Sequence, residues 1–128
     1  MIAEYVQNLK ENQGTLYYAK SLMKILYASK IESLRLYDTK NLPALASFYI
    51  VGTLLNENQA ESVVRLISKE FKKFFTIKYE GAGTPWILID AGDIIIHLFL
   101  QEARKIYSIE SLWKNFEEIS FNDSDYLL

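Results

Sequence analysis

The stretch that decides the fold is WILIDAGDIIIHLFL, residues 86–100. Two runs rich in β-branched and aromatic residues meet at an Ala-Gly pair, a pattern typical of two strands joined by a two-residue hairpin loop. With that loop, Asp90 stands opposite Asp93 and Trp86 opposite His97, so one face carries polar and aromatic side chains. The other face is expected to lie against helices because all its residues are aliphatic: Ile87, Ile89, Ile94, Ile96 and Leu98.

The composition is that of one globular domain. The 128 residues are 50% hydrophobic and 23% charged, and folding at this length buries roughly two-thirds of the unfolded chain's surface. There are no cysteines, so disulfides, thiolate nucleophiles and Cys-based zinc sites are excluded. Because neither a signal-like N-terminal segment nor a run of about 18 apolar residues is found, we expect a cytoplasmic protein of bacterial type, with an organelle left open.

The charge balance bears on the kind of partner. The formal net charge is -2 at pH 7, so no overall basic field attracts phosphates. We therefore expect little direct binding to nucleic acid, whereas a basic protein partner stays open. The lysines at 69, 72 and 73 are interpreted as the solvated side of a helix.

Apolar spacing elsewhere predicts alternating helices and strands. The expected elements are a helix over 16–29 capped by Thr15, strands over 31–39 and 48–55, a helix over 56–75 capped by Asn56 or Asn58, a short strand from 76, the hairpin, and two helices separated at Ser108. This order predicts an α+β domain with a mixed β-sheet flanked by helices. We divide the chain into an N-terminal extension (1–14), a folded domain (15–117) and an acidic C-terminal tail (118–128) that is a candidate for mobility.

Two helices have predicted inward faces. Helix 56–75 is expected to bury six apolar side chains: Ala60, Val63, Val64, Ile67, Phe71 and Phe74. The last short helix, which we expect Ser108 to cap, is expected to turn Leu112, Trp113 and Phe116 inward.

Three residues of the hairpin are candidates for chemistry. Asp90 and Asp93 would suit a metal or an acid–base pair, but aspartate is also common beside tight turns, which we favour. His97 would suit a general base, although a lone histidine in an apolar strand more often belongs to a core or an interface. No nucleophile elbow or phosphate-binding glycine loop is present. Trp86 is equally typical of an interface and of a core.

The segment from Glu80 to Trp113 resembles the signature of the ribosomal silencing factor family, also known as RsfS, Iojap or YbeB. The matching positions are Glu80, Gly81, Trp86, Asp90, Gly92, Asp93, His97, Phe99, Arg104, Tyr107, Leu112 and Trp113. Upstream, FYIVGT and Gln59 resemble the family's strand and helix start, so the similarity spans about residues 15–115. Ser47, Leu54 and Asn56 stand where the family usually has aspartate, glycine and serine.

The resemblance implies a fold of the nucleotidyltransferase type that works without catalysis. Such enzymes need a Gly-Ser corner and an Asp-x-Asp pair to hold two magnesium ions. Here the corner reads Gly52-Thr53-Leu54-Leu55, and no Asp-x-Asp pair follows in that region of the sheet. We therefore expect no enzyme activity, no metal and no cofactor, with a nucleotide-binding or nucleotidyltransferase-type enzyme and a self-associating scaffold as the alternatives.

The function implied by the resemblance is repression of translation when nutrients are scarce. The protein would bind large-subunit ribosomal protein number fourteen on the intersubunit face and block joining of the two subunits. We expect no membrane contact, and a homodimer stays open. The implied contact residues are Trp86 as the apolar anchor, Glu80, Asp90 and Asp93 as charge partners, His97 as a support for Trp86, Gly81 beside them, and Arg104 and Tyr107, which contact the partner or brace the sheet.

Overall fold

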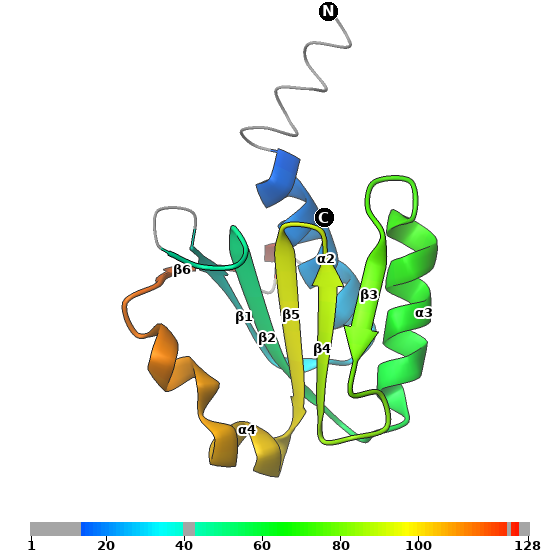
Figure 1. Cartoon of the computed structure of the whole chain (residues 1–128), viewed down its shortest axis with the longest axis vertical. Helices are drawn as coiled ribbons and strands as arrows, with labels where there is room; N and C mark the ends of the chain where they lie inside the picture. The colour runs from blue at the N-terminus through cyan, green and yellow to red at the C-terminus, as the bar shows by residue number, and fades with distance from the viewer. Residues whose placement is uncertain (1–13, 40–42, 123, 126–128) are drawn as a thin grey trace, which may run out of the picture.

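A mixed β-sheet forms the centre of the molecule (Figure 1). The computed structural model describes residues 14–39, 43–122, 124 and 125. Across these residues the sheet has six strands in the order β3-β4-β5-β2-β1-β6. Strands β2 and β5 pair in parallel, and the other neighbours pair antiparallel. The strands are β1 (Glu32–Asp38), β2 (Phe48–Leu54), β3 (Ile77–Glu80), β4 (Trp86–Ala91), β5 (Ile94–Leu100) and β6 (Glu117–Ile119).

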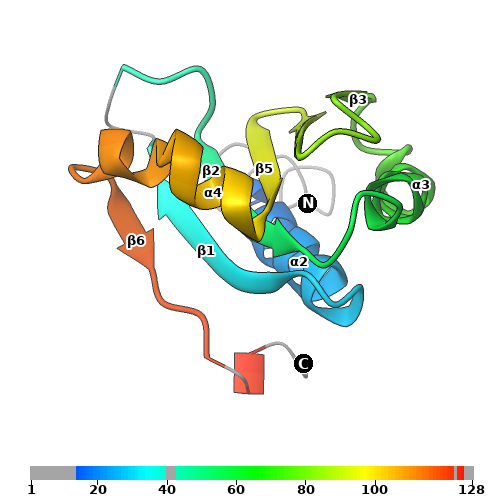
Figure 2. The same ribbon diagram turned by 90° about the horizontal axis from the view of Figure 1, so that it is seen from below.

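Helices cover the two faces of the sheet unequally (Figure 2). The long helices α2 (Gly14–Ala28) and α3 (Gln59–Phe71) pack on one face, which we call the helical face. The short helix α4 (Gln101–Tyr107) and the 3-10 helix η2 (Ile109–Trp113) lie on the other, which we call the open face. This arrangement confirms the predicted α+β class. No described helix is long and apolar enough to cross a membrane.

The core lies between the helical face and its two helices. Ile87, Ile89 and Ile96 have no exposed surface, as the hairpin pattern predicted. The prediction for Phe74 is wrong, because α3 ends at Phe71 and the Phe74 side chain is 51% exposed. Each fully buried aliphatic side chain contributes about 1.5–3 kcal/mol relative to an exposed one. The other predicted positions of α3 do face inward: Ala60, Val63, Val64, Ile67 and Phe71.

The predicted register of the β4–β5 hairpin is wrong by two residues. The loop is Gly92-Asp93, since Ala91 pairs with Ile94. Gly92 has a φ of +69°, which the first residue of a type II′ loop requires and which glycine adopts without steric cost. The glycine thus takes the first loop position, where the sequence analysis had placed the alanine.

This two-residue shift changes the cross-strand partners but not the faces. Trp86 lies opposite Phe99 and diagonal to His97, and Asp90 lies opposite Ile95. Side chains alternate along a strand with a period of two, so a shift by two residues keeps each one on its predicted face. The division into an aliphatic and a polar-aromatic face is therefore confirmed despite the wrong register.

The corner between β2 and α3 is held by hydrogen bonds of Asn56 and Gln59. The Gln59 backbone N–H donates to Asn56 Oδ1 at 3.0 Å, and the Leu55 N–H donates to Gln59 Oε1 at 2.8 Å. Gln59 Nε2 also donates to the Ser29 carbonyl at 2.7 Å, which ties α3 to the end of α2. Of the two predicted caps, Asn56 makes the capping bond, while Asn58 makes no side-chain cap bond.

The C-terminal segment differs from its prediction in three ways. Ser108 does not cap the second helix with its side chain; it adopts φ 47° and ends α4, its N–H donating to the Arg104 carbonyl at 3.1 Å. Trp113 is buried as predicted, whereas Leu112 is 77% exposed, because the 3-10 geometry places residues on different faces from an α-helix. Strand β6 was not predicted, and it runs through the tail boundary proposed at residue 118.

Candidate partner-binding site

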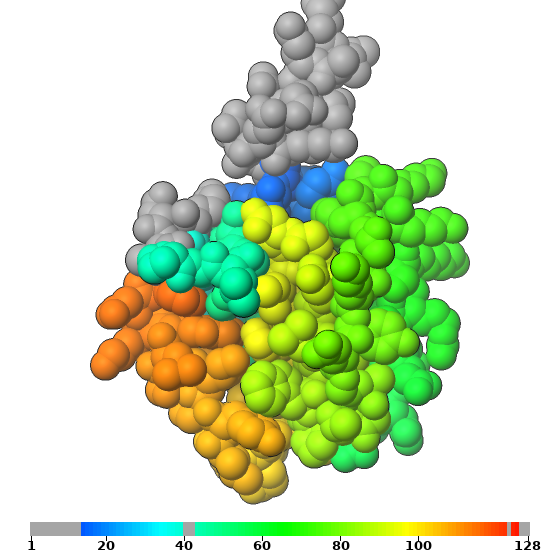
Figure 3. All heavy atoms as spheres, in the orientation of Figure 1, coloured from blue at the N-terminus to red at the C-terminus, as the bar shows by residue number. Residues whose placement is uncertain are grey.

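The uncovered part of the open face is formed by β3 and β4. Side chains of Trp86, Leu88 and Asp90 on β4 are half-buried, and the cross-strand neighbours Lys78 and Glu80 on β3 are exposed. In Figure 3 the atoms of β4 and β5 come to the surface between the C-terminal helices and α3. An antiparallel sheet with one solvated face normally carries polar residues there, so a half-buried tryptophan at this position is unusual.

Trp86 is held in place by an aromatic cluster. Its indole N–H donates to His97 Nδ1 at 3.2 Å. Its ring centroid lies 4.9 Å from that of Phe99, on the paired strand, and 4.9 Å from that of Tyr107, at the end of α4. Such tilted aromatic pairs contribute about 0.5–1.5 kcal/mol beyond area burial. The indole is therefore fixed in orientation while part of its surface stays in solvent.

His97 supports this cluster from inside the sheet. The side chain is only 6% exposed, and burial lowers the imidazole pKa to about 4. The ring is therefore neutral at physiological pH, with Nδ1 as the acceptor for the indole of Trp86. Its other ring neighbours include Trp113, at a centroid distance of 5.3 Å, and Tyr49, at 6.1 Å.

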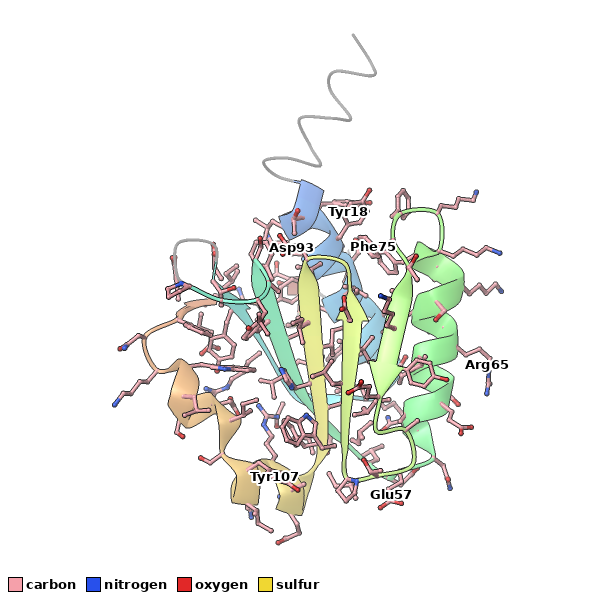
Figure 4. All side chains as sticks on the ribbon, in the orientation of Figure 1. Tyr18, Glu57, Arg65, Phe75, Asp93 and Tyr107 are labelled. Carbon is pink, nitrogen blue, oxygen red and sulfur yellow. The ribbon has the colours of Figure 1, made fainter. Side chains whose placement is uncertain are left out.

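The two aspartates of the hairpin lie in different places and make different contacts. Asp93 lies in the loop, where Oδ1 accepts the Ser47 N–H at 3.0 Å and Oδ2 accepts the Ser47 hydroxyl. This loop is at the opposite end of the sheet from Tyr107 (Figure 4). Asp90 instead lies on the uncovered sheet, directly across from Lys78. In the described part of the chain, no group of three or more His, Cys, Asp or Glu side chains could hold a metal ion.

Gly81 lies in the turn that precedes Trp86, the first residue of β4. Its φ is +88°, and a Cβ at this position would lie 2.2 Å from the Trp86 carbonyl oxygen. The Thr84 N–H donates to the Gly81 carbonyl at 3.0 Å, and the Leu100 N–H donates to the Pro85 carbonyl at 2.9 Å. The predicted site position of Gly81 therefore has a backbone reason, because only glycine combines this φ with so close a contact.

Arg104 joins three segments beneath the cluster. Its Nε donates to Glu110 Oε1, and one terminal nitrogen lies within hydrogen-bond distance of both the Ser33 carbonyl and Thr53 Oγ1, each contact at 2.8 Å. The arginine side chain is 13% exposed. Ser33 lies in a bulge of β1 and Thr53 near the end of β2, so the guanidinium links these strands to α4 and η2. All these contacts are internal to the chain.

Glu110 is the carboxylate that balances this arginine. Burial by itself would raise the Glu110 pKa, but hydrogen bonds from Arg104 and Tyr37 and the charge of Arg35 hold that pKa below its ordinary value. The Tyr37 hydroxyl donates to Glu110 Oε2 at 3.2 Å, and Arg35 Nε lies 3.8 Å from the same oxygen. The ionised carboxylate thus ties η2 to β1.

The structure brings together some predicted site residues and separates others. Trp86, His97 and Tyr107 are in contact, and Glu80 and Asp90 lie on the same sheet surface. Asp93 is excluded from this group by its position in the loop. Strand alternation places Leu88 on the same predicted face as Trp86, although Leu88 was not among the predicted contact residues. Lys78 was missed, because its position needs the β3–β4 register.

Fold and site together define a small α+β domain whose main surface feature is a fixed, partly exposed tryptophan on a sheet surface that also carries acidic side chains. The family model described as "Ribosomal silencing factor during starvation" matches residues 12–126. Because this match covers most of the chain, the protein belongs to the ribosomal silencing factor family.

Known relatives and a solved structure agree with this placement. The chain is 26% identical over 101 residues to ribosomal silencing factor RsfS of Bacillus subtilis, covering 73% of this chain and 86% of that protein. It is 30% identical over 95 residues to RsfS of Haemophilus influenzae, covering 72% and 93%. A crystal structure of a Chromobacterium violaceum protein superposes with a TM-score of 0.68 at 30% identity, covering 80% of this chain and 88% of that one.

The three positions that depart from the family signature are all accommodated. Ser47 donates from both its N–H and its hydroxyl to Asp93. Leu54 is 2% exposed at the end of β2. Asn56 supplies the acceptor that caps the turn before α3. Of the three, Asn56 belongs to the corner between β2 and α3, which its hydrogen bond helps to hold.

Proposed function

We propose that this protein represses translation by binding a basic protein of the large ribosomal subunit, namely large-subunit ribosomal protein number fourteen, on the intersubunit face. Membership of the ribosomal silencing factor family supports an association with the ribosome. The contact surface in this proposal is the uncovered part of the open face around Trp86. In a bacterium the protein would act in the cytoplasm, where ribosomes assemble.

The observation that carries the proposal is the state of Trp86. Tryptophan is among the residues that dominate binding energy at interfaces. Here its orientation is set by the hydrogen bond to His97 and by the rings of Phe99 and Tyr107. A side chain that is already immobilised loses little entropy on binding, so more of the contact energy is retained.

Charge supports a basic partner. Glu80 and Asp90 lie on the same sheet surface as the tryptophan, both on its Leu88 side, with Lys78 beside them. Complementary charge at the rim of an interface mainly speeds association and sets orientation. Arg104 and Glu110 neutralise each other inside the domain and act in this proposal as braces for α4.

The proposed mechanism is steric and requires no chemical step. A standard interface takes about 800 Å² from each partner, which is about a tenth of the 8133 Å² surface of this chain. Most of the domain therefore projects from the subunit that it binds. A folded body of this size on the intersubunit face would prevent the small subunit from docking.

The central test is co-sedimentation with purified large subunits. Trp86→Ala is expected to weaken binding by roughly 30-fold or more, the effect of losing an anchor worth at least 2 kcal/mol. Tyr79→Ala is the matched control, because Tyr79 is a 51% exposed aromatic on the neighbouring strand that points to the helical face. Trp86→Phe, which keeps a ring, covers the case in which the alanine variant does not fold. Wild-type binding by both Trp86 variants would reject the anchor role.

A subunit-joining assay tests the second half of the proposal. Wild-type protein added to large subunits before small subunits is expected to reduce the 70S-type particle peak in a sucrose gradient, and Trp86→Ala is expected to restore it. If wild-type protein binds large subunits and joining proceeds normally, the repression mechanism is wrong although the binding site stands.

A further inference from the structure

The small net charge of the protein conceals a strong separation of charge. The helical segments 14–31 and 57–75 together carry seven lysines and arginines against three acidic residues. Residues 76–125, which include most of the open face, carry four against nine. Such asymmetry between parts of a chain is typical of proteins with two different charged partners. The helical side is therefore the basic side of the molecule.

The outer side of α2 carries lysines and no acidic residue. Tyr17, Lys20 and Lys24 follow one another at helical spacing, and Tyr17 is 66% exposed. Segment 14–31 contains no acidic residue. Among the described residues, neither lysine forms an ion pair. These side chains place two lysines that make no ion pair in the described part of the chain next to an exposed aromatic ring.

A groove runs beside this helix. One hollow of about 360 Å³ is lined by Lys20, Lys24 and Phe121, and a second of about 960 Å³ continues from Phe121 past Lys30. In Figure 2 the chain after β6 crosses to the side of the sheet on which α2 lies, and it forms the other wall. That wall includes Asp125, so the excess of positive charge lies on the α2 side of the groove.

We propose that the outer side of α2, together with this groove, is a second contact surface, which binds single-stranded RNA. Lysines neutralise phosphates, and an exposed aromatic ring offers a platform on which a base stacks regardless of sequence. The surface lies on the opposite side of the sheet from Trp86, so both surfaces can be occupied at once. This inference stands on charge and geometry and does not depend on the identity of the protein bound at the open face.

The burial of α2 argues against a membrane as the anionic partner. A helix that lies on a membrane inserts its apolar side among the lipids. The apolar side of α2 is already used in the core, where Leu22, Met23 and Leu26 have no exposed surface. An acidic peptide would satisfy the lysines but would leave Tyr17 without a base to stack on.

The test is a fluorescence anisotropy titration with a labelled, unstructured oligouridine of about 12 nucleotides, within the usual site size of such surfaces. The variant Lys20→Gln/Lys24→Gln is compared with Lys72→Gln/Lys73→Gln, which removes the same charge from the end of α3. The α2 variant is expected to flatten the dependence of log K on log salt by about 1.4, since each phosphate contact on a single strand contributes about 0.7. Tyr17→Leu is expected to weaken binding about fivefold or more by loss of stacking.

Three outcomes would overturn the proposal. The first is an absence of RNA binding at low salt. The second is an equal loss in the two lysine variants, which would indicate a diffuse charge effect. The third is equal or tighter binding to polyglutamate or to phosphatidylserine vesicles. Trp86→Ala is expected to bind the RNA like wild type, and a loss in that variant would place the RNA on the open face instead.

Discussion

The two faces of the sheet differ in the side chains they carry and in how the helices cover them. On the helical face, side chains such as Ile89 and Ile96 carry no polar atoms and are sealed by α2 and α3. On the open face, Trp86, His97 and Arg104 each carry polar atoms that are hydrogen-bonded within the domain, and the covering α4 and η2 are short. The helical face therefore contributes mainly to folding stability. The open face is covered less completely and leaves polar and aromatic side chains at the surface.

This difference explains where a partner can bind. Apolar packing tolerates no gap, so the core positions of the helical face are sealed by α2 and α3, and its exposed part lies on the outer strand β3, at Tyr79. Polar groups on the open face are satisfied by partners within the domain, which leaves the edge of the indole and the nearby carboxylates available. If the comparison is right, substitutions on the helical face should act on folding, and substitutions on the open face should act mainly on binding.

The largest expected effect breaks the helical face. Ile89→Ala removes a fully buried side chain and is expected to lower the free energy of unfolding by about 2–5 kcal/mol in urea titration. Leu88→Ala, one residue away on the same strand, is half-buried on the open face and is expected to cost clearly less. Equal costs for the two substitutions would contradict the division of β4 into two faces.

The next effect concerns pH and the open face. The His97 pKa is about 4 in the folded protein against an ordinary value of 6.5, so the unfolded chain binds a proton over this range and the folded chain does not. His97 therefore has no effect on stability above pH 6.5 and lowers stability progressively as the pH falls toward 4. The loss reaches about 3 kcal/mol at pH 4, at 1.36 kcal/mol per pH unit. Wild-type and His97→Phe stabilities, measured by urea titration at each pH, should diverge in slope over that window.

Glu110 gives a pH dependence of the same sign over a lower pH range. Its pKa is below its ordinary 4.5 in the folded protein, so its stabilising effect is complete above pH 4.5 and is lost as the pH falls through the folded value. A stability profile that was flat between pH 6.5 and 4.5 would count against a buried neutral His97.

The smallest expected effect separates two glycines of the turn before β4. Gly81 and Gly83 both have positive φ, but a Cβ at Gly83 would meet no atom within 4 Å. Gly83→Ala is expected to cost about 1–2 kcal/mol from backbone strain alone. Gly81→Ala is expected to cost more, because its Cβ would also collide with the Trp86 carbonyl, and to weaken partner binding. Similar melting temperatures for the two variants would show that the turn relaxes without moving Trp86.

Much of the fold could be predicted because its signals are local. The stripe of α3, apart from Phe74, and the two faces of the hairpin were predicted correctly, since each follows from a spacing of a few residues. The hairpin register was wrong because the two-residue loop was taken to begin at Ala91. In the structure the positive φ of Gly92 makes Gly92 the first loop residue. Strand β6 is three residues long, which is too short for an alternation pattern to be seen.

The candidate site was predicted less completely than the fold. Trp86 and His97 were placed on one face by alternation alone. The separation of Asp93 from Asp90 follows from the hairpin register, which places Asp93 in the loop, where it bonds to Ser47, 46 residues away in the chain. Arg104 and Thr53 are 51 residues apart in the chain. A local sequence pattern cannot predict a hydrogen bond between residues so far apart.

The amino-acid sequence by itself determined which side chains share a face, because strand and helix periods are local properties of the backbone. It also determined the family, through matches spread over most of the chain. The tertiary structure alone decided which aspartate shares the sheet surface with Trp86, which hydrogen bonds hold the indole, and how charge divides between the two sides of the sheet. Those features arise where distant segments meet, and the free energy of such contacts depends on positions that only the folded chain defines.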